Sequence, residues 1–359
     1  MLLHVITSML TGGAEKLVSE LLPRFKVAGI DCGLALLDAE PTPFLQVIED
    51  AGIEIFALGH RRGSMYDPRA IARLRPLMAR ASIVHTHNTS PQFFAAAAWR
   101  KGGPKMVTTE HSTNNRRRRI PGFKALDRAM YSRYDSIVCC SQPVHDTLTA
   151  YLGKTMPAEH ITVINNGVNL APYLAITPRK PAETTEILMV SAFRPEKDHL
   201  TAMRALALLP DCFRLTFAGD GALRQQTMQE AERMGLAGRV TFTGNVADVP
   251  ALYRKADISL LSTSHEGMSL SIIEAMASGV PLVASDVDGV RGNVGDGAIL
   301  VPGADAKALA DTLSMLARSE SLRTETGRRG RENALKYDIE NTTQKYITLY
   351  NTLHSTTYR

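Results

Sequence analysis

The chain has 359 residues, of which 44% are apolar and 21% are charged, and its net charge is +5. A chain of this length is expected to form two domains, and the composition excludes a disordered or collagen-like protein. No uninterrupted apolar run approaches the ~18 residues that a membrane-spanning helix needs.

The first half alternates short apolar segments with longer amphipathic ones. Strands are predicted at residues 3–7, 33–37, 53–57, 83–86, 106–109, 136–140 and 161–164. Helices are predicted at 14–27, 68–80, 124–133 and 143–152. Apolar strands separated by helices indicate a parallel sheet covered on both faces. Residues 1–7 lack a basic region and a cleavage site, so they are interpreted as the first strand and not as a signal peptide.

The second half repeats this pattern after a segment rich in Pro, Ala and Thr at 171–185, which is interpreted as a linker. Strands are predicted at 187–191, 214–218, 240–243, 258–261, 281–285 and 298–301, and helices at 200–208, 222–234, 249–254, 270–278, 306–316, 321–337 and 340–353. The fold class is therefore α/β, with two doubly wound, Rossmann-like parallel sheets facing a central cleft. The expected domains are 1–170 and 171–336, with a C-terminal helix in 337–359 that crosses back onto the first domain. Such sheets bind ligands beyond the carboxyl ends of their strands.

Two further features concern charge and cysteine. Cys32, Cys139, Cys140 and Cys212 lack metal or disulfide spacing, which favours reduced, buried thiols in a cytosolic protein. The stretch 101–133 has nine basic and two acidic residues and is centred on Arg116, Arg117, Arg118 and Arg119. It is interpreted either as a solvated loop or as a patch for anionic lipid or a phosphate-bearing substrate. Nucleic acid is disfavoured because no aromatic residue interrupts the arginine run.

The most informative segment follows the strand at 258–261. Gly267 permits a tight turn, and the next helix offers free backbone N–H groups that can hold phosphate. Glu266 and Glu274 are about 12 Å apart in helical rise, which is too far for a carboxylate pair but suits two acceptors gripping one extended ligand. The alternative is a helix-capping Glu266 and a surface acid at Glu274.

This segment, 266–281, resembles the signature of retaining glycosyltransferases of the GT-B fold, specifically family 4. The resemblance implies that Glu266 contacts the donor sugar and Glu274 the ribose of a nucleotide. It also implies that the first domain binds the acceptor and the second binds the nucleotide sugar. Backbone amides that follow Gly267 would hold the diphosphate; they belong to Met268, Ser269 and Leu270.

Other motifs resemble the same family along most of the chain. Gly12 and Gly13 stand in its glycine-rich loop facing the diphosphate, although alone they indicate only a turn. His111 follows a strand, where the family has a histidine on the donor sugar; a lone histidine is otherwise more often structural. Residues 165–169 resemble a turn that ends the first domain. Gly219 lies in a Gly-Asp-Gly turn, and Asn245 and Val246 lie in a loop that pairs with the base.

The phosphate-binding segment departs from the family pattern. Lys197 occupies the expected lysine position, but Ala192 stands where the family has arginine. Arg194 could supply the guanidinium instead, or it could be a solvent-facing partner of Glu196 or Asp198.

The resemblance implies metal-independent transfer with retention, in which the catalytic residues are Glu266 and His111 at the donor sugar and Lys197 at the leaving diphosphate, whose charge it neutralises. No cofactor or metal is expected. The expected donor carries a nucleoside diphosphate, with UDP preferred. The expected acceptor is a glycan, lipid-linked or free, in bacterial surface polysaccharide or lipopolysaccharide synthesis. The expected place is the cytoplasm, with peripheral membrane contact through residues 116–119 and no nucleic acid. The alternatives are a sugar-nucleotide 2-epimerase of the same fold and a non-catalytic nucleotide-sugar-binding protein.

Overall fold

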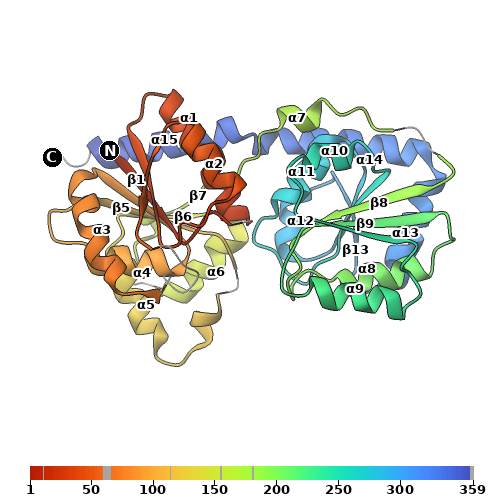
Figure 1. The fold of residues 1–359 in the computed structure, drawn as a ribbon, viewed down its shortest axis with the longest axis horizontal. Coiled ribbons are helices and arrows are strands. Elements are labelled where there is room, and N and C mark those ends of the chain that lie inside the picture. The colour runs from red at the N-terminus through yellow and green to blue at the C-terminus, as the bar shows by residue number, and fades with distance from the viewer. Residues whose placement is uncertain (11, 60–65, 114, 154–155, 180–181, 356–359) are drawn as a thin grey trace. The chain divides into compact units, whose positions relative to one another are not determined.

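The structure is a computed structural model that describes residues 1–10, 12–59, 66–113, 115–153, 156–179 and 182–355. The chain divides into two compact units (Figure 1). The N-terminal unit contains Met1–Gly167 and Ile339–Arg359, and the C-terminal unit contains Val168–Asp338. These bounds lie two or three residues from those expected at 170 and 336, and the last helix belongs to the N-terminal unit.

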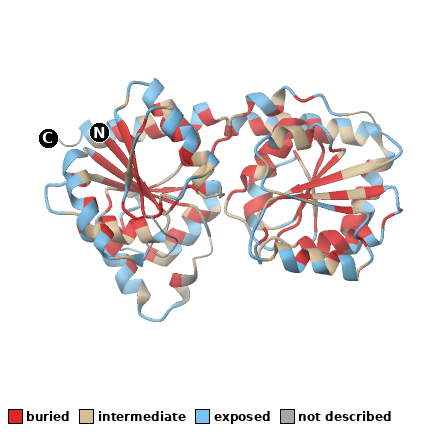
Figure 2. Cartoon of the chain, in the orientation of Figure 1, coloured by how far each residue is buried: buried red, intermediate tan, exposed pale blue. Residues whose placement is uncertain are grey.

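The N-terminal unit is built on a seven-stranded sheet in the order β3-β2-β1-β4-β5-β6-β7, in which neighbouring strands are parallel. Its central strands are buried along their whole length because helices cover both faces (Figure 2). The strands are β1 (Leu2–Ile6), β2 (Cys32–Leu36), β3 (Glu54–Ala57), β4 (Ile83–His87), β5 (Lys105–Glu110), β6 (Ser136–Cys139) and β7 (Ile161–Val163).

The helices of this unit include two, α2 and α4, that the periodicity did not predict. Thr42 caps the start of α2 by accepting a hydrogen bond from the Leu45 amide. The apolar face of α2 is only two turns long, which is too short for a clear period. The helices are α1 (Gly13–Val27), α2 (Pro43–Asp50), α3 (Arg69–Arg80), α4 (Thr89–Ala98), α5 (Phe123–Tyr131), α6 (Gln142–Leu152) and α15 (Ile339–Ser355), with 3₁₀ turns at Arg116–Arg119 and Ala158–His160.

The C-terminal helix α15 is part of the N-terminal core. Ile339, Tyr346 and Tyr350 are buried in the same apolar cluster as residues of α1, β1 and β2. The last helix of the chain, α15, which has 17 residues, therefore packs beside the first helix, α1, as Figure 1 shows.

The C-terminal unit has a six-stranded sheet in the order β10-β9-β8-β11-β12-β13, again with parallel pairings. Its strands are β8 (Thr185–Val190), β9 (Phe213–Ala218), β10 (Val240–Gly244), β11 (Ile258–Leu261), β12 (Leu282–Ser285) and β13 (Ile299–Val301). Its helices are α7 (Ala171–Leu174), α8 (His199–Ala207), α9 (Arg224–Arg233), α10 (Val249–Tyr253), α11 (Leu270–Ser278), α12 (Asp288–Val294), α13 (Ala306–Arg318) and α14 (Glu320–Ala334), followed by a 3₁₀ turn at Leu335–Tyr337.

The prediction of two doubly wound parallel sheets is confirmed, whereas two local predictions are wrong. The expected linker contains α7, because Tyr173 is buried and its ring centroid lies 5.8 Å from that of Tyr253. Cys212 is exposed, since it lies in the turn before β9, while the other three cysteines are buried as expected. Among the described residues, no helix is both long and apolar enough to cross a membrane.

The strand order reverses direction once in each sheet, between β1 and β4 and between β8 and β11. Loops that leave the carboxyl ends of these strands diverge and leave room for a ligand. A ligand site is therefore expected at these two edges.

Candidate active site

Two loops meet at the carboxyl edge of the C-terminal sheet, one after β8 and one after β11. Lys197 and Thr263 form an antiparallel bridge between them. The Asp198 amide donates to the Ser262 carbonyl at 3.0 Å, and the Ser264 amide donates to the Glu196 carbonyl at 2.9 Å. These backbone hydrogen bonds fix the position of Lys197 relative to the start of the 266–281 motif.

The side chains of Lys197 and Glu266 form an ion pair at this edge. They are 69 residues apart in sequence, and their side chains are 13% and 11% exposed. The structure thus brings together two residues that the sequence analysis assigned to one ligand. Such a partly buried ammonium can exchange its carboxylate partner for a ligand phosphate, since both are anionic oxygen acceptors.

The helix that follows, α11, begins at the same edge. Its N-cap is Ser269, whose side chain makes no capping hydrogen bond and instead lies 3.0 Å from the Ser271 hydroxyl. Met268, Ser269 and Leu270 are each 8% exposed. A helix start of this kind carries partial positive charge and N–H groups that can hold an anion. The interpretation of Glu266 as the capping acid is wrong, because Ser269 occupies that position.

Glu274 lies within α11 and is only 3% exposed. Burial raises the pKa of the Tyr253 hydroxyl, and the nearby Glu274 carboxylate raises it further. The alternative of a surface acid is therefore wrong. A buried carboxylate is costly unless it is hydrogen-bonded or paired, which favours a specific role for this side chain.

Glycines with positive φ shape the loop that holds Lys197. Gly219 and Gly221, after β9, have φ of +140° and +153°. A Cβ would lie 2.2 Å from the Ser191 carbonyl oxygen at Gly219 and 2.6 Å from the Phe193 carbonyl oxygen at Gly221. Only glycine allows this backbone approach. The Gly-Asp-Gly turn thus packs directly against the 191–198 loop.

The sequence analysis missed Gly289, in the first turn of α12. A Cβ there would lie 1.9 Å from the carbonyl oxygen of Glu266. The start of α12 therefore packs so closely against the backbone of the Glu266 loop that no side chain fits at Gly289. The only signal in the sequence was an Asp-Gly pair, which ordinarily indicates a turn.

The remaining predicted residues of this unit are more exposed. Arg194 is exposed and forms no ion pair with a residue that the structure describes, so its interpretation as a partner of Glu196 or Asp198 is wrong. Asp198 instead caps α8 by accepting from the Thr201 amide at 3.0 Å. Asn245 is exposed and Val246 is half-buried, just beyond the edge strand β10.

In the N-terminal unit, His111 follows β5 directly. Burial lowers its pKa to about 4, so the ring is neutral at pH 7. Its Nε2 lies 3.1 Å from the Nδ1 of His87, while its own Nδ1 is buried and has no hydrogen-bond partner among the described residues. Gly12 is the N-cap of α1, and Gly13 is the first residue of that helix.

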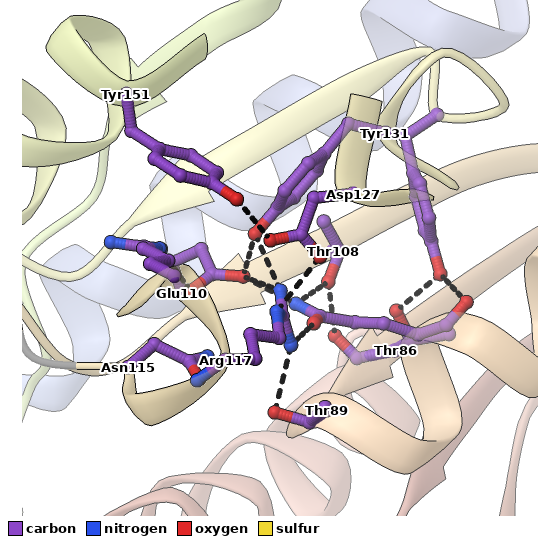
Figure 3. A network of polar contacts seen from close by, with 12 residues as sticks. Thr86, Thr89, Thr108, Glu110, Asn115, Arg117, Asp127, Tyr131 and Tyr151 are labelled. Carbon is purple, nitrogen blue, oxygen red and sulfur yellow. Dashed lines mark hydrogen bonds and ion pairs between the residues drawn. The ribbon is translucent and has the colours of Figure 1, made fainter. Parts of the chain in front are cut away.

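Of the four consecutive arginines, Arg117 (Figure 3) and Arg118 have buried side chains, so the prediction of an acceptor- or membrane-facing patch is wrong for these two residues. The Arg117 side chain is 5% exposed and lies 2.9 Å from the Asp127 carboxylate; that of Arg118 is 8% exposed and donates to Glu110 at 3.0 Å. The side chains of Arg116 and Arg119 lie outside what the structure describes. The run forms a 3₁₀ turn, at whose start the Asn115 side chain accepts a hydrogen bond from the Arg117 amide.

Glu110 is the centre of this network (Figure 3). Burial alone would raise the pKa of Glu110, but Arg117, Arg118 and hydrogen bonds from Tyr131 and Gln92 outweigh it and leave that pKa below its ordinary value. The Tyr131 hydroxyl donates to Glu110 at 2.5 Å. Because His111 is the next residue, the network anchors the end of the segment that carries it.

Comparison with known proteins decides the family. The family model described as Glycosyltransferase Family 4 matches residues 11–172, and the model described as Glycosyl transferases group 1 matches residues 177–333. The crystal structure of HepE from Anabaena with UDP and glucose matches with a TM-score of 0.84 and 19% identity over 98% of this chain and 99% of that one. The chain is a GT-B glycosyltransferase of the family 4 type.

Two curated relatives are named for sugar transfer to different acceptors or pathways. The lipopolysaccharide core biosynthesis glycosyltransferase LpsE of Rhizobium meliloti is 28% identical over 62% of this chain and 66% of its own length. The phosphatidyl-myo-inositol mannosyltransferase of Mycobacterium leprae is 33% identical over 53% of each chain. The chain thus spans about half to two thirds of the length of these two relatives.

One cluster in the glycosyltransferase was not predicted at all. His4, His85 and His87 are fully buried, and one ligand atom from each lies within 4.8 Å of the others. This is the one group of three that could hold a metal among the described residues. The sequence spacing concealed it, because β1 and β4 pair with His4 beside His85 although 81 residues separate them.

Proposed function

We propose that this glycosyltransferase transfers a sugar, with retention of anomeric configuration, from a nucleotide-diphosphate sugar to a hydroxyl of a glycan acceptor. UDP is the preferred nucleotide, and no metal is required. The observation that carries this proposal is the Lys197–Glu266 ion pair beside the start of α11.

The Lys197 ammonium neutralises the charge that develops on the leaving diphosphate. When a donor binds, its phosphate replaces the Glu266 carboxylate as the partner of Lys197, and the released Glu266 accepts hydrogen bonds from the sugar hydroxyls. The amides of Met268, Ser269 and Leu270 supply further positive potential to the diphosphate without a mobile cation. Arg194, being exposed and unpaired among the described residues, can add a second positive charge.

Glu274 is proposed to bind the ribose, because a buried carboxylate can accept two hydroxyl hydrogen bonds in a fixed orientation. His111 is proposed to contact the donor sugar. The acceptor hydroxyl would then attack from the side from which the nucleotide leaves, and a donor phosphate oxygen would take its proton.

The acceptor is proposed to be a lipid-linked glycan of a surface polysaccharide. The support is the names of the relatives, one of which acts in lipopolysaccharide core biosynthesis and another of which is a mannosyltransferase of phosphatidyl-myo-inositol. Since Arg117 and Arg118 point inward, we assign them no part in acceptor or membrane binding.

The test is a thermal-shift panel of UDP, GDP, ADP and their sugar derivatives, with EDTA present. A ligand that binds only the folded state raises the apparent melting temperature, so the base and sugar that stabilise the protein identify the donor. Glu274→Gln should weaken binding of the free nucleotide, whereas Glu266→Gln should leave nucleotide binding intact and lower sugar transfer. Equal losses of binding and transfer in both variants would contradict this division of roles.

The same ligands distinguish the alternatives. Conversion of a nucleotide sugar to its 2-epimer without acceptor would indicate an epimerase. A nucleotide sugar that binds but is not transferred to any fraction of a bacterial lipid-linked glycan pool would indicate a non-catalytic binding protein. A requirement for divalent metal, seen as loss of transfer in EDTA, would contradict the metal-independent mechanism.

A further inference from the structure

A continuous row of hydrogen-bonded side chains connects the C-terminal helix to His111. The Tyr350 hydroxyl, on α15, lies 3.4 Å from the Nε2 of His4. The Nδ1 of His4 lies 3.1 Å from the Nε2 of His87, whose Nδ1 lies 3.1 Å from the Nε2 of His111. The row crosses the β1–β4 switch point and ends on the unpartnered Nδ1 of His111.

The three rings of this row are neutral at pH 7. Burial lowers the pKa of His4 to about 3 and that of His111 to about 4, and burial together with its histidine neighbours lowers the pKa of His87 well below its ordinary value. A neutral imidazole donates from one nitrogen and accepts at the other. Each ring therefore dictates the tautomer of the next, and only two arrangements of the whole row satisfy every hydrogen bond.

Tyr350 selects between these two arrangements, because its hydroxyl carries a single proton. It contacts His85 Nδ1 at 2.6 Å and His4 Nε2 at 3.4 Å. The shorter contact is typical of an O–H donor, and a phenol donates more strongly than the Thr109 hydroxyl at the other nitrogen of His85. Tyr350 therefore donates to His85 and accepts from the protonated Nε2 of His4.

From this choice the rest of the row follows. His4 accepts at Nδ1 from the protonated Nε2 of His87, and His87 accepts at Nδ1 from the protonated Nε2 of His111. We propose that Tyr350, acting through the positioning residues His4 and His87, holds His111 in its Nε2–H tautomer, so that His111 Nδ1 presents a lone pair to a hydroxyl of the donor sugar. The assignment of the sugar as ligand rests on the proposed function, whereas the tautomer relay does not.

The same geometry disfavours a metal at His4, His85 and His87. Two of the three pairs of rings stack, with His85 and His87 centroids 4.4 Å apart at 28° and His4 and His87 centroids 5.2 Å apart at 20°, whereas His4 and His85 are tilted by 46°. The lone pairs of stacked rings do not converge on one point. All six ring nitrogens of these histidines also have a hydrogen-bond partner. Five contact another histidine or Tyr350, and the sixth, His85 Nε2, contacts Thr109 at 2.7 Å.

The test is ¹⁵N NMR of the full chain labelled at histidine, at pH 7.5 and without ligand. Protonated and unprotonated ring nitrogens resonate far apart, so the His111 pair of signals, assigned with His111→Gln, reports its tautomer directly. The wild-type protein should show Nε2 protonated and Nδ1 unprotonated. In Tyr350→Phe the two signals should move toward each other as the tautomers mix.

Tyr134→Phe is the matched control. Tyr134 is buried in the same unit, and its hydroxyl contacts Thr86 at 3.0 Å and the Gln92 carbonyl at 2.9 Å, neither of which belongs to the row. This variant should leave the His111 signals unchanged. His4→Phe interrupts the row at β1 instead of at α15 and should have the same effect on the His111 signals as Tyr350→Phe. One of the two variants therefore suffices if the other folds poorly.

Any of four results would overturn the proposal. They are unchanged His111 signals in both Tyr350→Phe and His4→Phe, equal changes in Tyr134→Phe, a wild-type His111 protonated at Nδ1, and stoichiometric Zn²⁺ binding that shifts the His4, His85 and His87 signals and so indicates a metal site. With a working transfer assay, Tyr350→Phe should lower kcat about two- to tenfold, the effect of one hydrogen bond. Failure of transfer in the wild-type protein would refute the proposed function and leave the NMR result standing.

Discussion

Removing the Arg117 guanidinium should destabilise the N-terminal unit severely. In Arg117→Gln, Asp127, which is fully buried, loses an ion-pair partner at 2.9 Å, and Tyr131, Gln92 and Thr89 lose hydrogen bonds of 2.8–3.0 Å. Removing one partner of a buried ion pair costs roughly 3–5 kcal/mol, because the remaining charge is left without compensation. The unit comprises 167 and 21 residues in its two segments, a size at which each kcal/mol lowers Tm by about 2–4 °C. The expected loss is therefore about 6–20 °C.

The dependence of this loss on pH gives the sharper test. In the wild-type protein the pKa of Glu110 lies below its ordinary value, so Glu110 contributes stability that is present above that ordinary value and is lost on acidification. In the variant, burial still raises the pKa of Glu110, but of the two arginines only Arg118 remains to lower it. Protonation then relieves the variant as pH falls, so the loss of Tm should be largest at pH 7–8 and should shrink as pH falls to 4. Full convergence requires a pH below the depressed pKa of Glu110 in the wild-type protein.

Thermal unfolding followed by circular dichroism over pH 4–8 measures both effects. Arg75→Gln is the matched control, because Arg75 is exposed on α3 of the same unit and should change Tm by no more than a surface substitution does. A loss below 2 °C at pH 7, or a loss that stays constant between pH 4 and 8, would refute the buried-charge reasoning. The latter would show that packing, and not charge, accounts for the effect.

Three other predictions follow from the C-terminal unit. Gly289→Ala should displace the Glu266 loop and lower the rate of sugar transfer by at least tenfold, because its Cβ would lie 1.9 Å from a backbone oxygen. The control is Gly292→Ala on the same helix, whose Cβ meets nothing within 4 Å; it should leave transfer unchanged and raise stability by ~0.4–1 kcal/mol. Similar transfer rates in the two variants would contradict this reasoning. Arg194→Gln should weaken binding of UDP more than binding of uridine, as measured by calorimetry, and equal weakening would show that Arg194 does not contact phosphate. In the folded protein a thiol reagent at pH 8 should modify Cys212 alone, since it is exposed and the other three cysteines are buried; rapid modification of a second thiol would contradict the burial.

Much of the fold was predictable from the sequence because its signals are local. The strand at Ile258–Leu261 and the helix at Leu270–Ser278 have the predicted bounds, since a continuous apolar run and a mostly apolar segment that ends at Gly279 are properties of neighbouring residues. The helices α2, α4, α7 and α12 were missed. Three of them have too few turns for a clear period, whereas α4 has ten residues but ends in four consecutive alanines, which show no apolar–polar period.

Part of the candidate site was also predictable. Glu266, Lys197 and the start of α11 were assigned to one ligand from their motifs, and the structure pairs the first two. The exposure of the arginine run could not be predicted, because net charge along the chain does not reveal which carboxylates a side chain faces. Asp127 and Glu110 are separated from Arg117 by 10 and 7 residues, on different elements.

The sequence by itself determined the family, the two parallel sheets and the residues at their carboxyl edges. Only the tertiary structure decided that Arg117 is buried, that Gly289 supports Glu266, and that His4, His87 and Tyr350 lead to His111. The physical reason is that strand order in a parallel sheet differs from chain order. Pairing of β1 with β4 places His4 beside His85, and packing of α15 brings Tyr350 from the far end of the chain to both of them.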